Sequence, residues 1–130
     1  MKSYTDLDQS KKLAEILPLE SADMCYSNDG TAIKIDANPY TVRYSMWKDC
    51  VAEIIPCWSL AALISILPNN KHITTTLSRG GWKIEPIEYI DIWWCKYEDD
   101  SHTKDFSVSA SNPIDACVVM IEKLHELKML

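Results

Sequence analysis

Apolar residues recur at helical spacing in residues 5–17 and again in residues 59–67. Thr5, with Asp8 three residues later, predicts a capping-box-like start for the first helix, and Pro18 predicts its end. Ser59 is the expected N-cap of the second helix. We expect the first helix to cover a core from outside and the second to be buried in it. Their apolar positions are Leu13, Ile16 and Leu17, and then Leu60, Leu63, Ile64 and Leu67.

The last helix has the clearest signals. Asn112 is a favourable N-cap, Pro113 suits the first helical position, and Asp115 places a negative charge in the first turn. We expect this helix to run to the end of the chain with charged residues facing outward. Its expected apolar face consists of Ile114, Cys117, Val118, Ile121, Leu124 and either Leu127 or His125.

Two other stretches have the period of strands. Residues 22–35 predict a hairpin whose turn includes Asp29 and Gly30, with Gly30 at a positive φ. Residues 73–110 alternate as an antiparallel meander of three or four strands. Its predicted turns are Gly80-Gly81, the neighbourhood of Pro86 and the polar loop 99–104. Residues 36–56 fit a strand and a short helix equally well.

These elements predict a two-layer α+β fold, in which an antiparallel β-meander packs with N-terminal, central and C-terminal helices. The chain has 130 residues, 47% of them hydrophobic and 25% charged. That length and composition suit one globular domain over residues 1–130.

The charge pattern excludes some partners. The net charge of −6 is spread over the chain, and Arg43 and Arg79 are its only arginines. Binding to the nucleic-acid backbone requires a cationic surface, so nucleic acid is not an expected partner. Residues 54–70 carry no charge, but the helix between Pro56 and Pro68 is too short to cross a bilayer. Because the N-terminus has no secretory pattern, we expect a cytoplasmic protein without a membrane anchor.

The sequence contains few candidates for catalytic, metal-binding or phosphate-binding residues. The five cysteines include no C-x-x-C pair, and the three glycines form no phosphate-binding loop. His72, His102 and His125 lack zinc-site spacing, and the acidic residues 98–100 lack the spacing of a calcium loop. We therefore expect no metal and no cofactor. Cys57 is the one candidate nucleophile, because the start of the following helix would lower its thiol pKa; the other interpretation is a buried small hydrophobic residue.

Tryptophan is unusually frequent, with five in the chain. In the strand predicted over residues 89–98, Trp93 lies on one face, whereas Ile90, Ile92 and Trp94 lie on the other. Both faces are largely apolar. Either helices flank the sheet on both sides, or one face contacts a partner.

Residues 56–68 (PCWSLAALISILP) and 112–127 (NPIDACVVMIEKLHEL) are similar to a group of small proteins of unassigned function from gut bacteria and their prophages or mobile elements. The similarity includes the N-terminal segment YTDLDQSKKLAEILP and the Trp-rich strand. It implies a bacterial or phage setting and assigns no catalytic residue.

The leading hypothesis is a non-enzymatic accessory or regulatory protein that binds a protein partner, or itself as a homodimer, through Ile90, Ile92 and Trp94. The alternative is a small cysteine-dependent enzyme that uses Cys57. A third possibility is carbohydrate binding, because an exposed indole can stack on a sugar ring.

Overall fold

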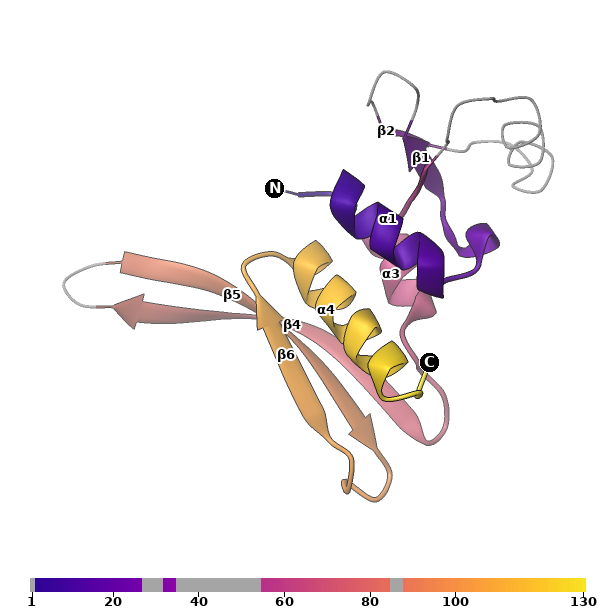
Figure 1. The fold of residues 1–130 in the computed structure, drawn as a ribbon. Coiled ribbons are helices and arrows are strands. Elements are labelled where there is room, and N and C mark those ends of the chain that lie inside the picture. The colour runs from indigo at the N-terminus through magenta and orange to yellow at the C-terminus, as the bar shows by residue number, and fades with distance from the viewer. Residues whose placement is uncertain (1, 27–31, 35–54, 85–87) are drawn as a thin grey trace. The chain divides into compact units, whose positions relative to one another are not determined.

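The computed structural model describes residues 2–26, 32–34, 55–84 and 88–130; of residues 33–34, 81–84 and 88–91 it describes the backbone alone. The described elements are helices and antiparallel strands, which confirms the α+β class (Figure 1). The chain divides into two compact units, Ser3–Ala62 and Leu63–Leu130 together with Lys2. The single domain expected over residues 1–130 stays a prediction.

The unit Ser3–Ala62 contains a three-stranded antiparallel sheet in the order β2-β1-β3. β1 (Met24–Tyr26) pairs with β2 (Ala32–Lys34), so both strands of the predicted hairpin are confirmed; its turn lies outside the described residues. β3 (Ile55–Cys57) pairs with the other edge of β1. The end of the ambiguous segment 36–56 is therefore a strand, and its residues 36–54 lie outside the described part.

Helix α1 (Leu7–Ile16) begins one residue later than predicted. Asp6, not Thr5, is the N-cap: its carboxylate accepts from the Gln9 amide at 2.8 Å, and the Gln9 side chain accepts from the Asp6 amide at 3.1 Å. This is a complete capping box with Gln at its third position. A 3₁₀ turn, η1 (Leu19–Ser21), follows Pro18.

Thr5 instead connects the N-terminal segment to the residue after β3. Its amide donates to the Trp58 carbonyl at 2.9 Å, and its hydroxyl accepts from the Trp58 amide at 3.1 Å. The Tyr26 hydroxyl donates to the Thr5 carbonyl at 2.6 Å. Thr5 and Trp58 are both fully buried, so these bonds satisfy polar groups that water does not reach.

Helix α3 (Leu60–Ile66) is confirmed close to its predicted bounds. The Ser59 hydroxyl accepts from the Ala62 amide at 3.3 Å, as expected of an N-cap, and itself donates to Asp23. Leu63 and Leu67 are buried as predicted, but Ile64 is exposed. Among the described residues, no helix combines the length and the apolar character that crossing a bilayer requires.

The unit Leu63–Leu130 contains the predicted meander, with strands β4 (Ile73–Ile84), β5 (Glu88–Asp99) and β6 (Phe106–Ala110) in that order. The turn predicted at Gly80-Gly81 is wrong: both glycines lie inside β4 and pair with Ile92 and Asp91 of β5. The turn expected near Pro86 lies outside the described residues. The loop predicted over 99–104 is confirmed between β5 and β6.

Helix α4 (Pro113–Glu126) packs on β5 and β6 within this unit (Figure 1). Its predicted start is confirmed, because the Asn112 side chain accepts from the Asp115 amide at 2.9 Å and Pro113 follows the cap. The helix ends at Glu126 rather than at the chain end. His125 and Leu127 are exposed, so neither completes the apolar face. The buried residues of α4 are Pro113, Ile114, Ala116, Cys117, Val118, Met120, Ile121 and Leu124.

We predict that Asn112→Ala lowers the free energy of unfolding by about 1 kcal/mol, because the amide at the start of α4 loses its acceptor. Urea denaturation followed by circular dichroism measures this change. Asn112→Ser keeps an oxygen at the cap and serves as the matched control. An unchanged denaturation midpoint in Asn112→Ala would contradict this role of the cap.

Candidate functional site

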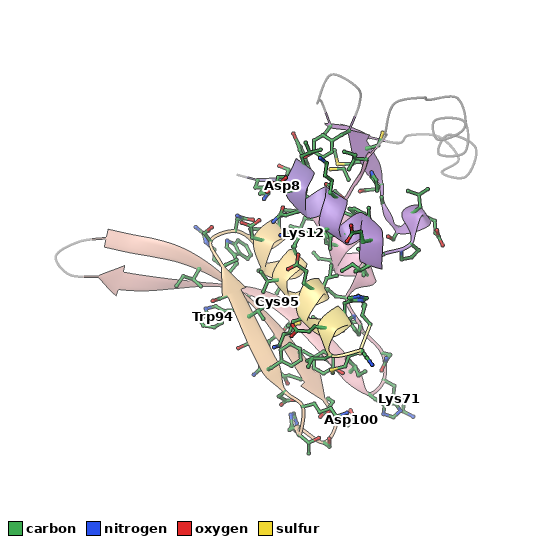
Figure 2. The ribbon with its side chains drawn as sticks, viewed as in Figure 1. Asp8, Lys12, Lys71, Trp94, Cys95 and Asp100 are labelled. Carbon is green, nitrogen blue, oxygen red and sulfur yellow. The ribbon has the colours of Figure 1, made fainter. Side chains whose placement is uncertain are left out.

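Successive residues of β5 lie on opposite faces of the sheet, and α4 covers one of these faces. Cys95 and Tyr97 are buried on the covered face, where Tyr97 stacks on Phe106 with ring centroids 5.3 Å apart. Trp93 shares this face, and the Arg79 guanidinium lies 6.0 Å from its ring centroid. Trp94 follows Trp93 in the strand and therefore belongs to the other face (Figure 2).

That other face, here called the open sheet face, is not covered by α4. Trp94 and Ile92 are half-buried on it, and the side chain of Ile90 lies outside the described part. The strand pairing places Ser78 of β4 and Ser109 of β6 directly beside Trp94. The side chains that the open sheet face leaves exposed are Thr74, Thr76, Ser78, Lys96, Ser107 and Ser109. The indole is thus an apolar centre with polar neighbours, which is a smaller apolar area than the strand alone suggested.

Gly80 positions the indole of Trp94. A Cβ atom at Gly80 would lie 3.1 Å from the indole Nε1 and 3.2 Å from its Cδ1. The indole therefore occupies the space that a side chain would fill, as when an aromatic residue covers a glycine on a neighbouring strand. This close approach explains why a glycine lies within a long strand.

The β5–β6 loop is held by side chains that accept backbone hydrogen bonds. The Asp99 carboxylate accepts from the Ser101 hydroxyl at 3.0 Å and the Thr103 amide at 3.3 Å. The Asp99 amide donates to Asp105 at 3.0 Å. His102 has a left-handed backbone with φ of 53°, which these bonds support. The loop is therefore ordered by its own polar groups.

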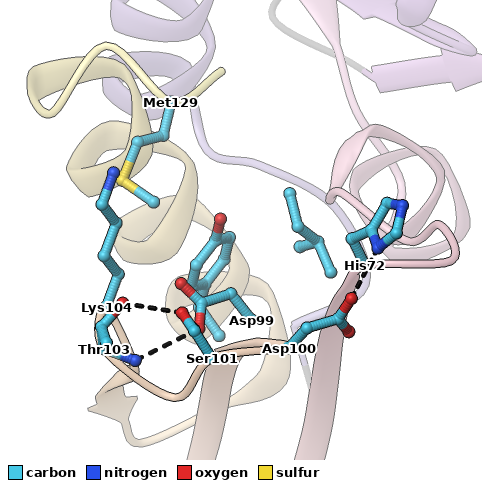
Figure 3. A pocket seen from close by; sticks show the side chains of 9 residues that line it. His72, Asp99, Asp100, Ser101, Thr103, Lys104 and Met129 are labelled. Atoms are coloured by element: carbon cyan, nitrogen blue, oxygen red, sulfur yellow. Dashed lines mark hydrogen bonds and ion pairs between the residues drawn. The ribbon is translucent and has the colours of Figure 1, made fainter.

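An open pocket of about 530 Å³ lies beside this loop (Figure 3). Its polar groups largely bind one another: His72 pairs with Asp100, and Asp99 is occupied by the loop. The imidazole and both carboxylates that line the pocket are therefore already engaged. The lining residues are His72, Ile73, Tyr97, Asp99, Asp100, Ser101, Thr103, Lys104 and Met129.

Cys57 is fully buried, and its thiol donates to the Thr5 carbonyl at 3.5 Å. Burial raises the pKa of the Cys57 thiol, and hydrogen bonds from its neighbours offset only part of that increase. The lowered pKa expected from the following helix is wrong, because Cys57 lies in β3 among core residues. The structure thus favours the interpretation of Cys57 as a small core residue.

The fold brings together one group of possible metal-ligating side chains that the spacing in the sequence did not reveal. Ligand atoms of Glu98, His102 and Asp105 all lie within 4.8 Å of one another. The only signal in the sequence is a histidine and an acid three residues apart, shortly after another acid. His72 and His125 are not members of this group and are exposed, as expected.

No match to a protein-family model, a curated protein or a solved structure is found. The resemblance carried by residues 56–68 and 112–127 stays a prediction. Function is therefore inferred from the geometry of the chain itself.

We predict that Gly80→Ala moves the indole of Trp94, because the added methyl group would lie closer to it than an ordinary contact allows. The indole N–H signal of Trp94, assigned by its loss in Trp94→Phe, should shift in a two-dimensional NMR spectrum. Ser78→Ala, which changes an exposed neighbour on the same strand, should affect it less. A Trp94 signal that Gly80→Ala leaves in place would contradict the contact.

We predict that Cys57 resists alkylation in the folded protein, because its thiol is buried and its pKa is raised. Mass spectrometry after iodoacetamide treatment at pH 6 and pH 8, with and without urea, measures the extent of modification. Cys57 should react only in urea. Faster reaction in the folded protein at pH 6 than in urea would instead indicate an activated thiolate.

Proposed function

We propose that this chain is a non-enzymatic binding protein whose open sheet face contacts a protein partner at Trp94. The observation that carries the proposal is the half-buried Trp94 on the face of the sheet opposite α4. Tryptophan is enriched among the residues that contribute most to protein interfaces, where it offers a large contact area with few rotatable bonds. Trp94 therefore serves as the central anchor.

The surroundings of Trp94 support this role. Gly80 has no side chain, so the indole can lie close to the backbone of β4 and present a broad, flat apolar surface. Ser78 and Ser109 flank the indole and supply hydroxyl groups for hydrogen bonds at the rim. An apolar centre within a polar rim is the usual anatomy of a protein interface.

Charges on the open sheet face also favour a protein over a nucleic acid. Lys96 pairs with Glu98 at 3.1 Å, so the cation beside Trp94 is balanced by an acid on the same face. The chain as a whole carries a net charge of −6. Phosphate binding requires an excess of positive charge, which this combination does not provide.

The biological setting follows from the resemblance to small proteins of gut bacteria and mobile elements. In that setting the chain acts as an accessory or regulatory protein in the cytoplasm. The genes beside it discriminate among such roles: a neighbouring toxin gene favours an immunity role, whereas replication or packaging genes favour a phage accessory role. Self-association through the same face, giving a homodimer, is the competing outcome.

We predict that Ser109→Lys abolishes partner binding, because it places a charged side chain beside Trp94 without altering the covered face. Trp94→Ala should weaken binding by about tenfold or more, which is the loss of a strong interface anchor. Capture of the partner by the tagged parent and its variants, followed by a binding titration, measures both effects.

Val119→Lys is the matched control, because Val119 is an exposed apolar residue on α4. It should bind like the parent. If Ser109→Lys and Trp94→Ala also bind like the parent, the open sheet face is not the interface. Sedimentation of the parent alone tests the homodimer: a dimer that Trp94→Ala dissociates would replace the external partner with a second copy.

A further inference from the structure

Two exposed histidines in the unit Leu63–Leu130 pair with aspartates. His72 Nδ1 lies 2.5 Å from an Asp100 carboxylate oxygen, and His102 Nδ1 lies 2.7 Å from Asp105. Both pairs have the same chemistry and lie at the same end of the sheet, where β4 begins and β5 is joined to β6. They therefore provide a comparison within one molecule.

Only the His102 pair gains a third ligand group within the described part of the chain. Glu98 supplies a second carboxylate, and the ligand atoms of the three side chains all lie within 4.8 Å of one another. Zinc binds imidazole nitrogen and carboxylate oxygen at about 2.0–2.2 Å in tetrahedral geometry, which places its ligand atoms about 3.3–3.6 Å apart. Binding would therefore require side-chain rotations that separate His102 Nδ1 from the Asp105 oxygen, now 2.7 Å away, and keep the Glu98 carboxylate within reach.

The backbone that carries these ligands is already fixed. Glu98 lies within β5, where it pairs with Thr74 of β4. Asp105 accepts from the Asp99 amide, and the His102 amide donates to the Asp99 carbonyl at 3.2 Å. No strand or helix has to move for the ligands to converge, which lowers the cost of binding an ion.

The cluster also attracts a cation in the structure itself. Lys96 reaches Glu98 at 3.1 Å, and its side chain is largely exposed. The Lys96 ammonium thus occupies a position where a metal ion would bring greater charge.

We propose that Glu98, His102 and Asp105 form a site for a divalent transition metal ion, and that Zn²⁺ is the ion it suits best. One imidazole with two carboxylates favours Zn²⁺ over Ca²⁺ and Mg²⁺, which take oxygen ligands alone. Three protein ligands leave a coordination position open for water or another donor. The proposal does not rest on the protein-binding role, because its ligands are different side chains.

Competition titrations with a chromophoric zinc chelator measure the affinity of the full chain and its variants, and ring signals of the histidines in NMR spectra locate the ion. We expect one Zn²⁺ per chain and shifts confined to His102. Loss of one ligand in His102→Ala or Glu98→Gln should weaken binding by about tenfold or more. His72→Ala is the matched control and should bind Zn²⁺ like the parent.

Lys96→Met adds a readout that nonspecific binding would not change. It frees Glu98 from its ion pair and removes a positive charge, so Zn²⁺ binding should become tighter. Circular dichroism verifies that each variant is folded. The site is overturned if the parent binds no Zn²⁺, if His72→Ala and His102→Ala weaken binding equally, or if Lys96→Met leaves the affinity unchanged.

Discussion

The unit Leu63–Leu130 depends on the burial of one face of a three-stranded sheet under a single helix, α4. One helix covers one face, and strand residues alternate between faces. Cys95 and Tyr97 are therefore buried by α4, while Trp94 and Lys96, which alternate with them along β5, belong to the open sheet face. Residues that stabilise the unit and residues available for binding are interleaved along one strand.

This alternation separates stability from recognition. A change on the covered face removes packing against α4, where burial of one large apolar side chain contributes about 1.5–3 kcal/mol. A change at an exposed position such as Ser109 alters the surface and leaves that packing in place. The functional hypothesis can therefore be tested without unfolding the protein.

Features controlled by local sequence could be predicted. The start of α4 needs only Asn112, Pro113 and the amide of Asp115, all within four residues, and its predicted start agrees with the structure. The meander followed in the same way from the two-residue period of its strands. The shift of the first cap from Thr5 to Asp6 shows the limit of this reasoning. Thr5 is a good N-cap by type, but its hydroxyl binds Trp58, which is distant in sequence.

Features that depend on a neighbouring strand could not be predicted. Gly80 and Gly81 have the composition of a turn, yet Trp94 of β5 fills the space above Gly80 and keeps it within a strand. The His102 cluster has the same origin. Its ligands come from the end of β5 and from the loop, and their spacing matches no metal-binding motif. In both cases strand pairing creates the proximity.

The two proposed sites share one strand face, which links them physically. Trp94, Lys96 and Glu98 are alternate residues of β5 and therefore project from the same side of the sheet. Lys96 lies between the proposed anchor and the proposed ligand, and it pairs with Glu98. A metal ion that took Glu98 would release the Lys96 ammonium. The open sheet face beside Trp94 would then carry an unpaired positive charge and favour an acidic partner surface. Metal occupancy would thus change which partner the Trp94 face prefers, with no movement of the backbone.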